Sequence, residues 1–230
     1  TPKTKLLIIN SPANPTGGVL NREEIARIAE LAVEHDLTVL ADEIYSEILY
    51  EGEHVSIATM PGMAERTIIL DGFSKTYAMT GWRLGYGAMP EEFAQVIANL
   101  MVNSNSCTSM AVQRAGLEAL TGPQDEVRAM VEAFRKRRDL IVDGLNAIDG
   151  ISCLRPKGAF YVFPNISGVG MKSKPFADVL LQDHGVAGLS GTAFGRYGEG
   201  YLRLSYANSE ENLQKALGRI AAAVEAVRPA

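Results

Sequence analysis

Residues 67–87 read TIILDGFSKTYAMTGWRLGYG, and this stretch decides the fold. Its first residues, Thr67 to Leu70, are rich in β-branched side chains, which predicts a short strand. Lys75 follows among small residues, and Arg83 stands eight positions later in a glycine-rich segment. Long cations are usually scattered over solvated helix faces. Here a strand runs directly into a turn-rich segment that carries two of them.

Two further strands are predicted upstream. Lys5 to Asn10 (KLLIIN) is an apolar run that ends in the turn-rich NSPANPTGG, and Thr38 to Ala41 (TVLA) is another short run of β-formers. Between them, Asn21 with Glu24 three residues later predicts the start of a helix. Strand, helix and strand at this spacing predict parallel strands with crossover helices, and such sheets gather ligands at the carboxyl ends of their strands.

The second half of the chain predicts longer helices and a smaller α+β unit. The expected helices cover Phe93 to Met101, Pro123 to Ile148, Lys174 to His184 and Glu210 to Val227. The expected strands cover Ile151 to Leu154, Phe160 to Phe163 and Tyr201 to Leu204. We therefore expect residues 1–122 to form part of a large domain, residues 123–148 a linking helix and residues 149–230 a small C-terminal domain.

Composition excludes several classes of partner. The 230 residues are 47% hydrophobic and carry a formal net charge of −5, and the longest basic run is Arg135–Arg138. No concentrated basic face for a nucleic acid is therefore expected, and the basic run is predicted to lie on a solvated helix face. No apolar run approaches the length needed to span a bilayer, so no membrane partner is expected.

Cysteine and histidine usage predicts no metal site. Cys107 and Cys153 are far apart and lack the spacing of zinc ligands or of a disulfide framework, which favours a reducing, cytoplasmic setting. The three histidines have no partner spacing and are expected at the surface or at helix ends: His35, His54 and His184.

Several polar residues fall in loops or at the ends of predicted strands. They are Asn14, Asp42, Tyr45, Ser74, Lys75, Arg83 and Arg203. Taken alone, each has an ordinary interpretation: Asp42 as the N-cap of a helix beginning at Glu43, Tyr45 as a core residue, Asn14 as a turn residue. Only their joint occurrence, in this order, indicates a site.

Four motifs carry a resemblance to a known family. They are Asn14-Pro15-Thr16-Gly17, Ala41-Asp42-Glu43-Ile44-Tyr45, Gly72-Phe73-Ser74-Lys75 with Gly81-Trp82-Arg83-Leu84-Gly85, and Tyr201-Leu202-Arg203-Leu204-Ser205. Together they resemble the class I and II aminotransferases, which are pyridoxal phosphate (PLP) enzymes of the aspartate aminotransferase fold, fold type I. The resemblance covers essentially the whole chain. It implies an α/β fold with a mainly parallel large-domain sheet, here partial, and a small α+β C-terminal domain.

The resemblance implies PLP as the cofactor and a role for each residue. Lys75 would form the Schiff base with PLP and later move the proton from the substrate Cα. Asp42 would face the pyridine nitrogen, and Asn14 and Tyr45 would hydrogen-bond the phenolic oxygen of the ring. Lys75, Asp42 and Tyr45 are thus the expected catalytic residues.

The remaining cations would bind anionic groups. Ser74 and Arg83 would hold the cofactor phosphate, so that Lys75 and Arg83 face one anionic cofactor. Arg203, with Asn14, would bind the α-carboxylate of the substrate.

The chain also departs from the family pattern. Gly72 stands where many relatives carry a serine that contacts the phosphate, and Ser190 stands where proline is common. The family's N-terminal portion, with its phosphate loop and the aromatic residue that stacks on the cofactor, is absent from these residues. We therefore expect uncovered apolar surface, association into a homodimer or higher oligomer, and weakened PLP affinity in the chain alone.

The expected reaction is exchange of an amino group between an amino acid and a 2-oxo acid. Two alternatives remain open at this point. One is another PLP reaction on the same fold, such as a C–S lyase or a cyclopropane-forming synthase. The other is a truncated domain without catalysis. The residues do not identify the amino donor or the acceptor.

Overall fold

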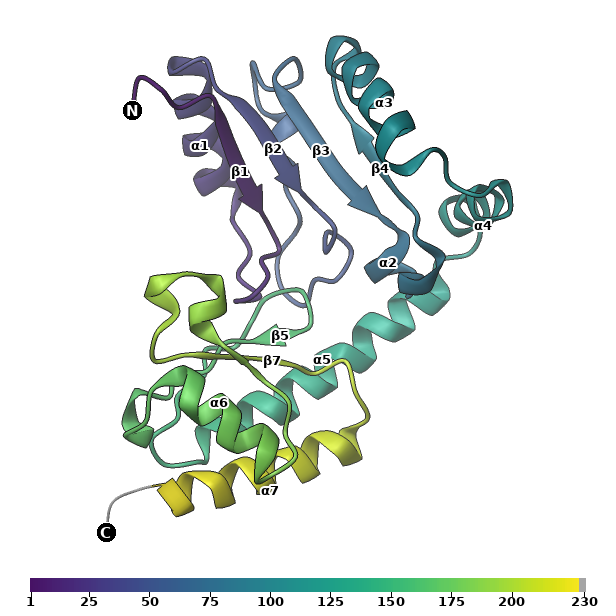
Figure 1. The fold of residues 1–230 in the computed structure, drawn as a ribbon. Coiled ribbons are helices and arrows are strands. Elements are labelled where there is room, and N and C mark those ends of the chain that lie inside the picture. The colour runs from purple at the N-terminus through teal and green to yellow at the C-terminus, as the bar shows by residue number, and fades with distance from the viewer. Residues whose placement is uncertain (228–230) are drawn as a thin grey trace. The chain divides into compact units, whose positions relative to one another are not determined.

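The computed structural model describes residues 1–227, which divide into two compact units (Figure 1). Unit 1 comprises Thr1–Ala13 and Val19–Ala129, and unit 2 comprises Asn14–Gly18 and the described residues from Met130 onward. The second boundary falls inside α5 (Asp125–Asn146). The short loop 14–18 belongs by its contacts to the second unit, although unit 1 surrounds it in the sequence.

Unit 1 is built on a four-stranded sheet of order β1-β2-β3-β4. Its strands are β1 (Leu6–Asn10), β2 (Thr38–Asp42), β3 (Thr67–Gly72) and β4 (Gly85–Ala88). The first three are parallel, as their arrows in Figure 1 show, and β4 runs antiparallel to β3. The expectation of a mainly parallel α/β sheet is confirmed, although the sequence did not predict the strand β4.

The helix α1 (Arg22–Glu34) covers one face of this sheet and begins as predicted. The Asn21 side chain accepts a hydrogen bond from the Glu24 backbone N–H at 2.9 Å, and the Glu24 carboxylate accepts one from the Asn21 N–H at 2.8 Å. This capping box satisfies two N–H groups that an α-helix leaves unpaired at its start. Buried side chains of α1 then pack on the strand residues Val39 and Ala41 to form the core of unit 1.

The other regular elements of unit 1 are helical, and the sequence did not predict α4. They are α2 (Phe73–Thr76), α3 (Glu91–Asn105), α4 (Met110–Thr121) and the 3₁₀ turns η1 (Ile57–Thr59) and η2 (Thr80–Trp82). Apolar side chains of α3 lie exposed in the part of the chain that the structure describes: Val102 is 63% exposed, and Val96 and Leu100 are similar. The expectation of uncovered apolar surface is therefore met on α3.

Unit 2 pairs a small antiparallel sheet of order β5-β7-β6 with helices. The elements are β5 (Tyr161–Val162), β6 (Leu189–Ser190), β7 (Leu202–Ser205), α6 (Ser173–Gln182), α7 (Glu210–Val227), η3 (Ser167–Val169), η4 (Gly191–Phe194) and η5 (Arg196–Gly198). The expected α+β character is confirmed. The strand predicted at Ile151–Leu154 is wrong, because this segment contributes one isolated bridge, Ser152 with Asn165.

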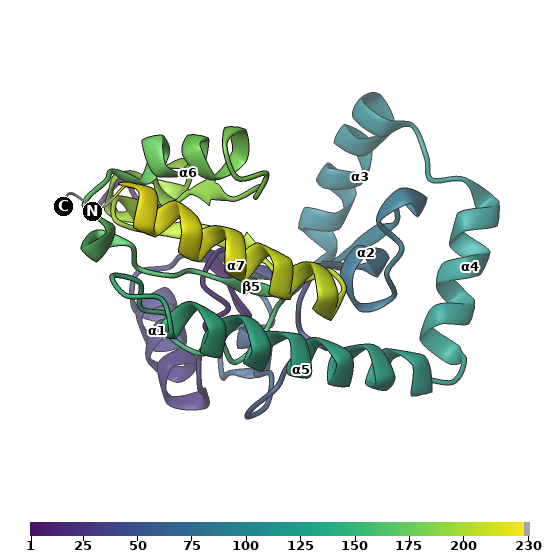
Figure 2. The same ribbon diagram turned by 90° about the horizontal axis from the view of Figure 1, so that it is seen from below.

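Within unit 2, α5 and α7 run alongside each other (Figure 2). A Cβ placed on Gly144 of α5 would lie 2.3 Å from a methyl carbon of Leu217 on α7, so a larger residue there would push the helices apart. Arg138 of α5 is only 4% exposed and donates to the Pro156 carbonyl at 3.1 Å. The prediction of a wholly solvated basic run is therefore wrong at Arg138.

No helix within residues 1–227 is long and apolar enough to cross a membrane. Over the same residues, no group of three or more His, Cys, Asp or Glu side chains is arranged to hold a metal ion.

Candidate functional site

Two neighbouring strands of unit 1 end in the residues that sequence analysis singles out. Asp42 is the last residue of β2 and lies opposite Leu70 of β3. Tyr45 follows β2, and Ser74 and Lys75 lie on α2 directly after β3. Because the strands are parallel, their carboxyl ends meet at one edge of the sheet.

The clearest contact within this group joins Lys75 to Tyr45. The Lys75 Nζ lies 5.8 Å from the centre of the Tyr45 ring, over its face. Tyr45 is buried at 3% exposure, while Lys75 and Ser74 are half-buried. Residues thirty positions apart are thus brought into one site by the pairing of β2 with β3.

Both the backbone carbonyl and the side-chain carboxylate of Asp42 accept hydrogen bonds. Its carbonyl accepts hydrogen bonds from Asn10 Nδ2 at 3.2 Å and from the Ser11 N–H at 3.4 Å. Its Oδ1 accepts from the Ile44 N–H at 3.3 Å. A turn, not a helix, follows, so the interpretation of Asp42 as a helix N-cap is wrong, and the carboxylate instead closes an Asx-type turn.

Close packing against β4 explains why position 72 is a glycine, where many relatives carry a serine. It lies opposite Gly85 in the β3–β4 pair, and a Cβ on Gly72 would be 2.8 Å from the Gly85 Cα and 3.0 Å from the Leu84 carbonyl oxygen. Any side chain at this position would force the two strands apart. A serine hydroxyl is therefore excluded by the close approach of β4.

Arg83 begins the turn into β4 and has left-handed backbone dihedrals, with φ of 54°. Its side chain is exposed, and Nη1 donates to the Thr80 carbonyl at 2.9 Å. One edge of the Arg83 guanidinium is therefore occupied by a backbone carbonyl of the preceding turn, η2.

A second carboxylate, that of Asp71, lies near the end of β3 and is not among the residues that the sequence predicted for the site. Asp71 accepts from the Gly72 N–H at 2.6 Å and from the Tyr86 hydroxyl at 3.1 Å. Burial raises the pKa of Asp71 above its usual range, against the lowering effect of these two hydrogen bonds. Burial and the neighbouring Asp71 raise the pKa of Tyr86 to about 12, so Tyr86 remains a hydrogen-bond donor at neutral pH.

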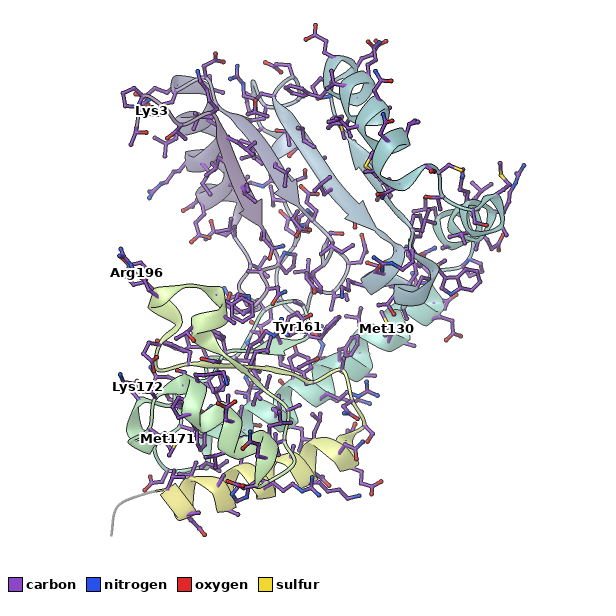
Figure 3. All side chains as sticks on the ribbon, viewed as in Figure 1. Lys3, Met130, Tyr161, Met171, Lys172 and Arg196 are labelled. Atoms are coloured by element: carbon purple, nitrogen blue, oxygen red, sulfur yellow. The ribbon has the colours of Figure 1, made fainter. Side chains whose placement is uncertain are left out.

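Unit 2 brings the other two predicted residues together. Arg203 on β7 donates through Nη1 to Asn14 Oδ1 at 3.1 Å, although the two are 189 positions apart. Its guanidinium carbon lies 4.6 Å from the centre of the Tyr161 ring and 5.2 Å from that of Phe194. Figure 3 labels Tyr161 among the side chains of this unit. Arg203 Nε is buried and has no hydrogen-bond partner among the described residues.

The loop that carries Asn14 is fixed by Gly17. Gly17 has a φ of 66°, and its carbonyl accepts hydrogen bonds from the N–H groups of Lys157 and Gly158, both at 3.0 Å. A Cβ at this position would lie 2.4 Å from the Pro156 Cβ. Only glycine permits this approach, which attaches the Asn-Pro-Thr-Gly loop to the Pro-Lys-Gly turn of unit 2.

The predicted site residues therefore form two groups. Unit 1 holds Asp42, Tyr45, Ser74, Lys75 and Arg83, whereas unit 2 holds Asn14 and Arg203. His54, expected at the surface or at a helix end, is instead half-buried beside the Glu43 carboxylate, 2.9 Å away. That expectation is wrong for His54 and holds for His35, which ends α1.

With both groups defined, the chain can be compared with known proteins. The family model described as aminotransferase class I and II matches residues 1–220. The chain belongs to the class I and II aminotransferase family. The resemblance drawn from the four motifs is thereby confirmed.

The curated relatives that match the chain are also named as aminotransferases. The putative aminotransferase YugH of Bacillus subtilis is 49% identical over 220 residues, which cover 96% of this chain and 57% of that protein. Aromatic-amino-acid aminotransferase 2 of Thermococcus litoralis is 44% identical over 223 residues, again 96% and 57%. The chain thus spans little more than half the length of these curated relatives.

Solved structures have the same fold. The aromatic aminotransferase from Pyrococcus horikoshii has a TM-score of 0.95 and 42% identity, over 98% of this chain and 61% of that one. The Thermus thermophilus aspartate aminotransferase with maleate has a TM-score of 0.89 and 45% identity, over 97% and 58%. The expected fold class is therefore confirmed.

The donor set of this chain fits PLP, the cofactor that the family implies. An aldehyde needs an amine, a pyridine nitrogen needs a carboxylate, and a phosphate needs hydroxyl and guanidinium donors. Unit 1 supplies Lys75, Asp42, Ser74 and Arg83 for these groups at one edge of its sheet. In unit 2, the buried Nε of Arg203 is a donor suited to a carboxylate.

Proposed function

We propose that the protein transfers an amino group between an amino acid and a 2-oxo acid with PLP as its cofactor. The observation that carries this proposal is the placement of Lys75 over the Tyr45 ring at the strand edge where Asp42 also lies. An amine, a phenol and a carboxylate at the carboxyl ends of two adjacent parallel strands supply the groups that transamination requires.

Each residue of unit 1 would have a defined task. PLP, when bound, supplies the electron sink that allows the Cα–H bond of an amino acid to break. Lys75 Nζ would attach the cofactor covalently and, once released, would take the Cα proton. Asp42 would hold a proton at the ring nitrogen, and Tyr45 would donate to the phenolic oxygen. Ser74 and Arg83 would bind the phosphate, with Arg83 using the donors that the Thr80 carbonyl does not occupy.

The residues of unit 2 would bind the substrate. A carboxylate accepts two parallel hydrogen bonds from one guanidinium, and Arg203 offers the buried Nε with a neighbouring Nη. The Tyr161 and Phe194 rings and the bond to Asn14 would keep this guanidinium in place, which orients the Cα–H bond for cleavage. These contacts select an α-carboxylate, while the names of the relatives include both aspartate and aromatic aminotransferases.

The first test is to map where PLP attaches. The purified chain is mixed with PLP, reduced with borohydride and digested, and the modified lysine is located by mass spectrometry. We expect the label on Lys75, an absorbance band that changes when an amino acid is added, and loss of both in Lys75→Ala.

The matched control is Lys3→Ala, which removes an exposed lysine of the same unit. Label spread over surface lysines, equal in the wild type and in Lys75→Ala, would contradict the assignment of Lys75. Release of pyruvate and a thiol that does not depend on a 2-oxo acid would show that the reaction is C–S elimination and not transamination.

We also infer that the working protein is a homodimer located in the cytoplasm. The exposed apolar side chains of α3 support association, because such patches on monomeric proteins are small. Free Cys107 and Cys153 support a reducing compartment. Light scattering is expected to give at least twice the mass of one chain, and a monodisperse monomer would contradict the homodimer.

A further inference from the structure

Glu43, His54 and Ser56 form a hydrogen-bonded cluster, named here the Glu43 cluster, beside the turn that carries Asp42 and Tyr45. Glu43 Oε2 lies 2.9 Å from His54 Nε2, and Glu43 Oε1 accepts from the Ser56 hydroxyl at 2.6 Å. All three belong to unit 1. Glu43 lies within one of the four motifs, but neither the motifs nor the proposed mechanism assigns a role to any of the three.

Strand alternation places Glu43 on the core face of the sheet. Val39 and Ala41 are buried in the core under α1, and Glu43 is the next residue in this alternating series. The Glu43 N–H still donates to the Leu70 carbonyl at 2.9 Å, so the extended pairing continues to this residue. By the same alternation, Asp42 belongs to the opposite face.

Glu43 is 9% exposed, and a carboxylate so far removed from water is stable only when partners replace its hydration. Both of its oxygens are engaged, one by an imidazole and one by a hydroxyl. The position of Glu43 is therefore tied to His54 and Ser56.

Two local backbone hydrogen bonds close the turn that follows Asp42. The Ser46 N–H donates to the Glu43 carbonyl at 2.8 Å, and the Ile48 N–H donates to the Tyr45 carbonyl at 2.9 Å. These bonds set the internal shape of the turn. The Glu43 side chain adds a connection from the turn to the separate segment that precedes η1.

We infer that the Glu43 cluster positions Asp42 and Tyr45 for the cofactor ring. Glu43, His54 and Ser56 are then positioning residues that act through the backbone of residues 42–45, because no ring contact is assigned to them. This inference rests on the proposed function, since only a bound cofactor gives Asp42 and Tyr45 a target. The rate of the proposed reaction depends on where Asp42 and Tyr45 lie. A displacement of either side chain that is small compared with the distance between reacting atoms lowers this rate.

Glu43→Ala and Glu43→Gln test the inference together. Alanine removes both hydrogen bonds, whereas glutamine keeps an oxygen for Ser56 and offers an N–H to His54. In the chain without PLP, we expect amide exchange at Ser46 and Ile48 to become on the order of tenfold faster in Glu43→Ala. Glutamine is expected to restore the exchange rates to near the wild-type values.

With PLP bound at Lys75, the second readout is the pH midpoint of the absorbance change of the cofactor, which depends on the groups at the ring nitrogen and the phenolic oxygen. Glu43→Ala is expected to shift this midpoint and to lower kcat on the order of tenfold with KM nearly unchanged. Glu53→Ala is the matched control, because Glu53 is an exposed carboxylate one residue before His54. It is expected to change neither readout.

The inference is overturned if Glu43→Ala lowers only the melting temperature and leaves both amide exchange and the midpoint as in the wild type. It is also overturned if exchange rises but the midpoint stays, because the turn then moves without consequence for the cofactor. Should Glu43→Ala not fold, Ser56→Ala and His54→Asn decide by the same two readouts. Absence of PLP at Lys75 in the wild type refutes the proposed function separately, and the exchange measurement still reports on the turn.

Discussion

At the scale of single residues, Arg203 combines features that surface arginines lack. Its guanidinium lies against two aromatic rings, donates to Asn14 and retains a buried Nε without a partner among the described residues. A buried donor left unpaired is unfavourable, and sites that bind a ligand are where such groups persist. The proposed function assigns a planar acceptor with two oxygens, the substrate carboxylate, to this donor.

Arg203→Lys should therefore weaken substrate binding while the charge is kept. An ammonium cannot form the bidentate pair, so we expect KM for the amino acid to rise roughly 10- to 100-fold in steady-state kinetics. Arg196→Lys is a close control, since Arg196 also lies over a tyrosine ring, Tyr197, at 4.7 Å but is exposed. Equal effects of the two substitutions would refute the role of Arg203 in carboxylate binding.

At the scale of elements, the antiparallel strand β4 determines which residue can precede the segment Phe73-Ser74-Lys75. Gly72 and Gly85 face each other across the β3–β4 pair, and the two backbones approach more closely than a Cβ allows. This approach fixes the end of β3, and therefore the start of α2, where Ser74 and Lys75 lie.

Gly72→Ala should destabilise unit 1 by about 1–3 kcal/mol, as overpacking does in well-packed interiors. The expected result is a lower urea midpoint of unfolding with an unchanged slope. Gly81→Ala provides the control, because a Cβ at Gly81 has nothing within 4 Å and the residue lies in the same stretch, residues 67–87. A control as unstable as Gly72→Ala would point to a general intolerance of this segment, contrary to the steric explanation.

At the scale of the whole molecule, each unit contains one cysteine that reports on it. Cys107 is exposed in unit 1, and Cys153 is buried in unit 2. Burial raises the pKa of the Cys153 thiol to about 11, with smaller opposing effects from a backbone hydrogen bond and from Arg155. Below that pH the thiol stays protonated, and the protonated form is not the nucleophile.

Thiol labelling at pH 8 should therefore modify Cys107 rapidly and Cys153 only when unit 2 opens. In Cys107→Ser, we expect labelling of Cys153 to be at least about tenfold slower in native buffer than in denaturant, and to accelerate as pH rises towards 11. Mass spectrometry of the labelled peptides measures both rates. Rapid modification of Cys153 in native buffer would contradict the buried positions of Ile151 and Cys153 in unit 2.

Much of the fold was predictable because local chemistry decides it. The Asn21–Glu24 capping box, the short β-branched strands and the long apolar period of α5 depend on neighbours in the sequence. β4 was missed because its sequence, Gly-Tyr-Gly-Ala, has few β-formers and is held by pairing with β3. The strand expected at 151–154 failed for the converse reason, since a β-favourable run forms a strand only where a partner pairs with it.

The motif residues of the site were predictable from their order, but their grouping was not. By itself the sequence determined which residues carry amine, carboxylate, phenol and guanidinium chemistry, because these are properties of side chains and of the turns around them. Only the tertiary structure decided that Lys75 lies over Tyr45, that Arg138 is buried beneath Pro156, that Arg203 meets Asn14 and that Glu43 is tied to His54. Those contacts join residues 11 to 189 positions apart in the chain, and their energies depend on packing and burial that no local pattern encodes.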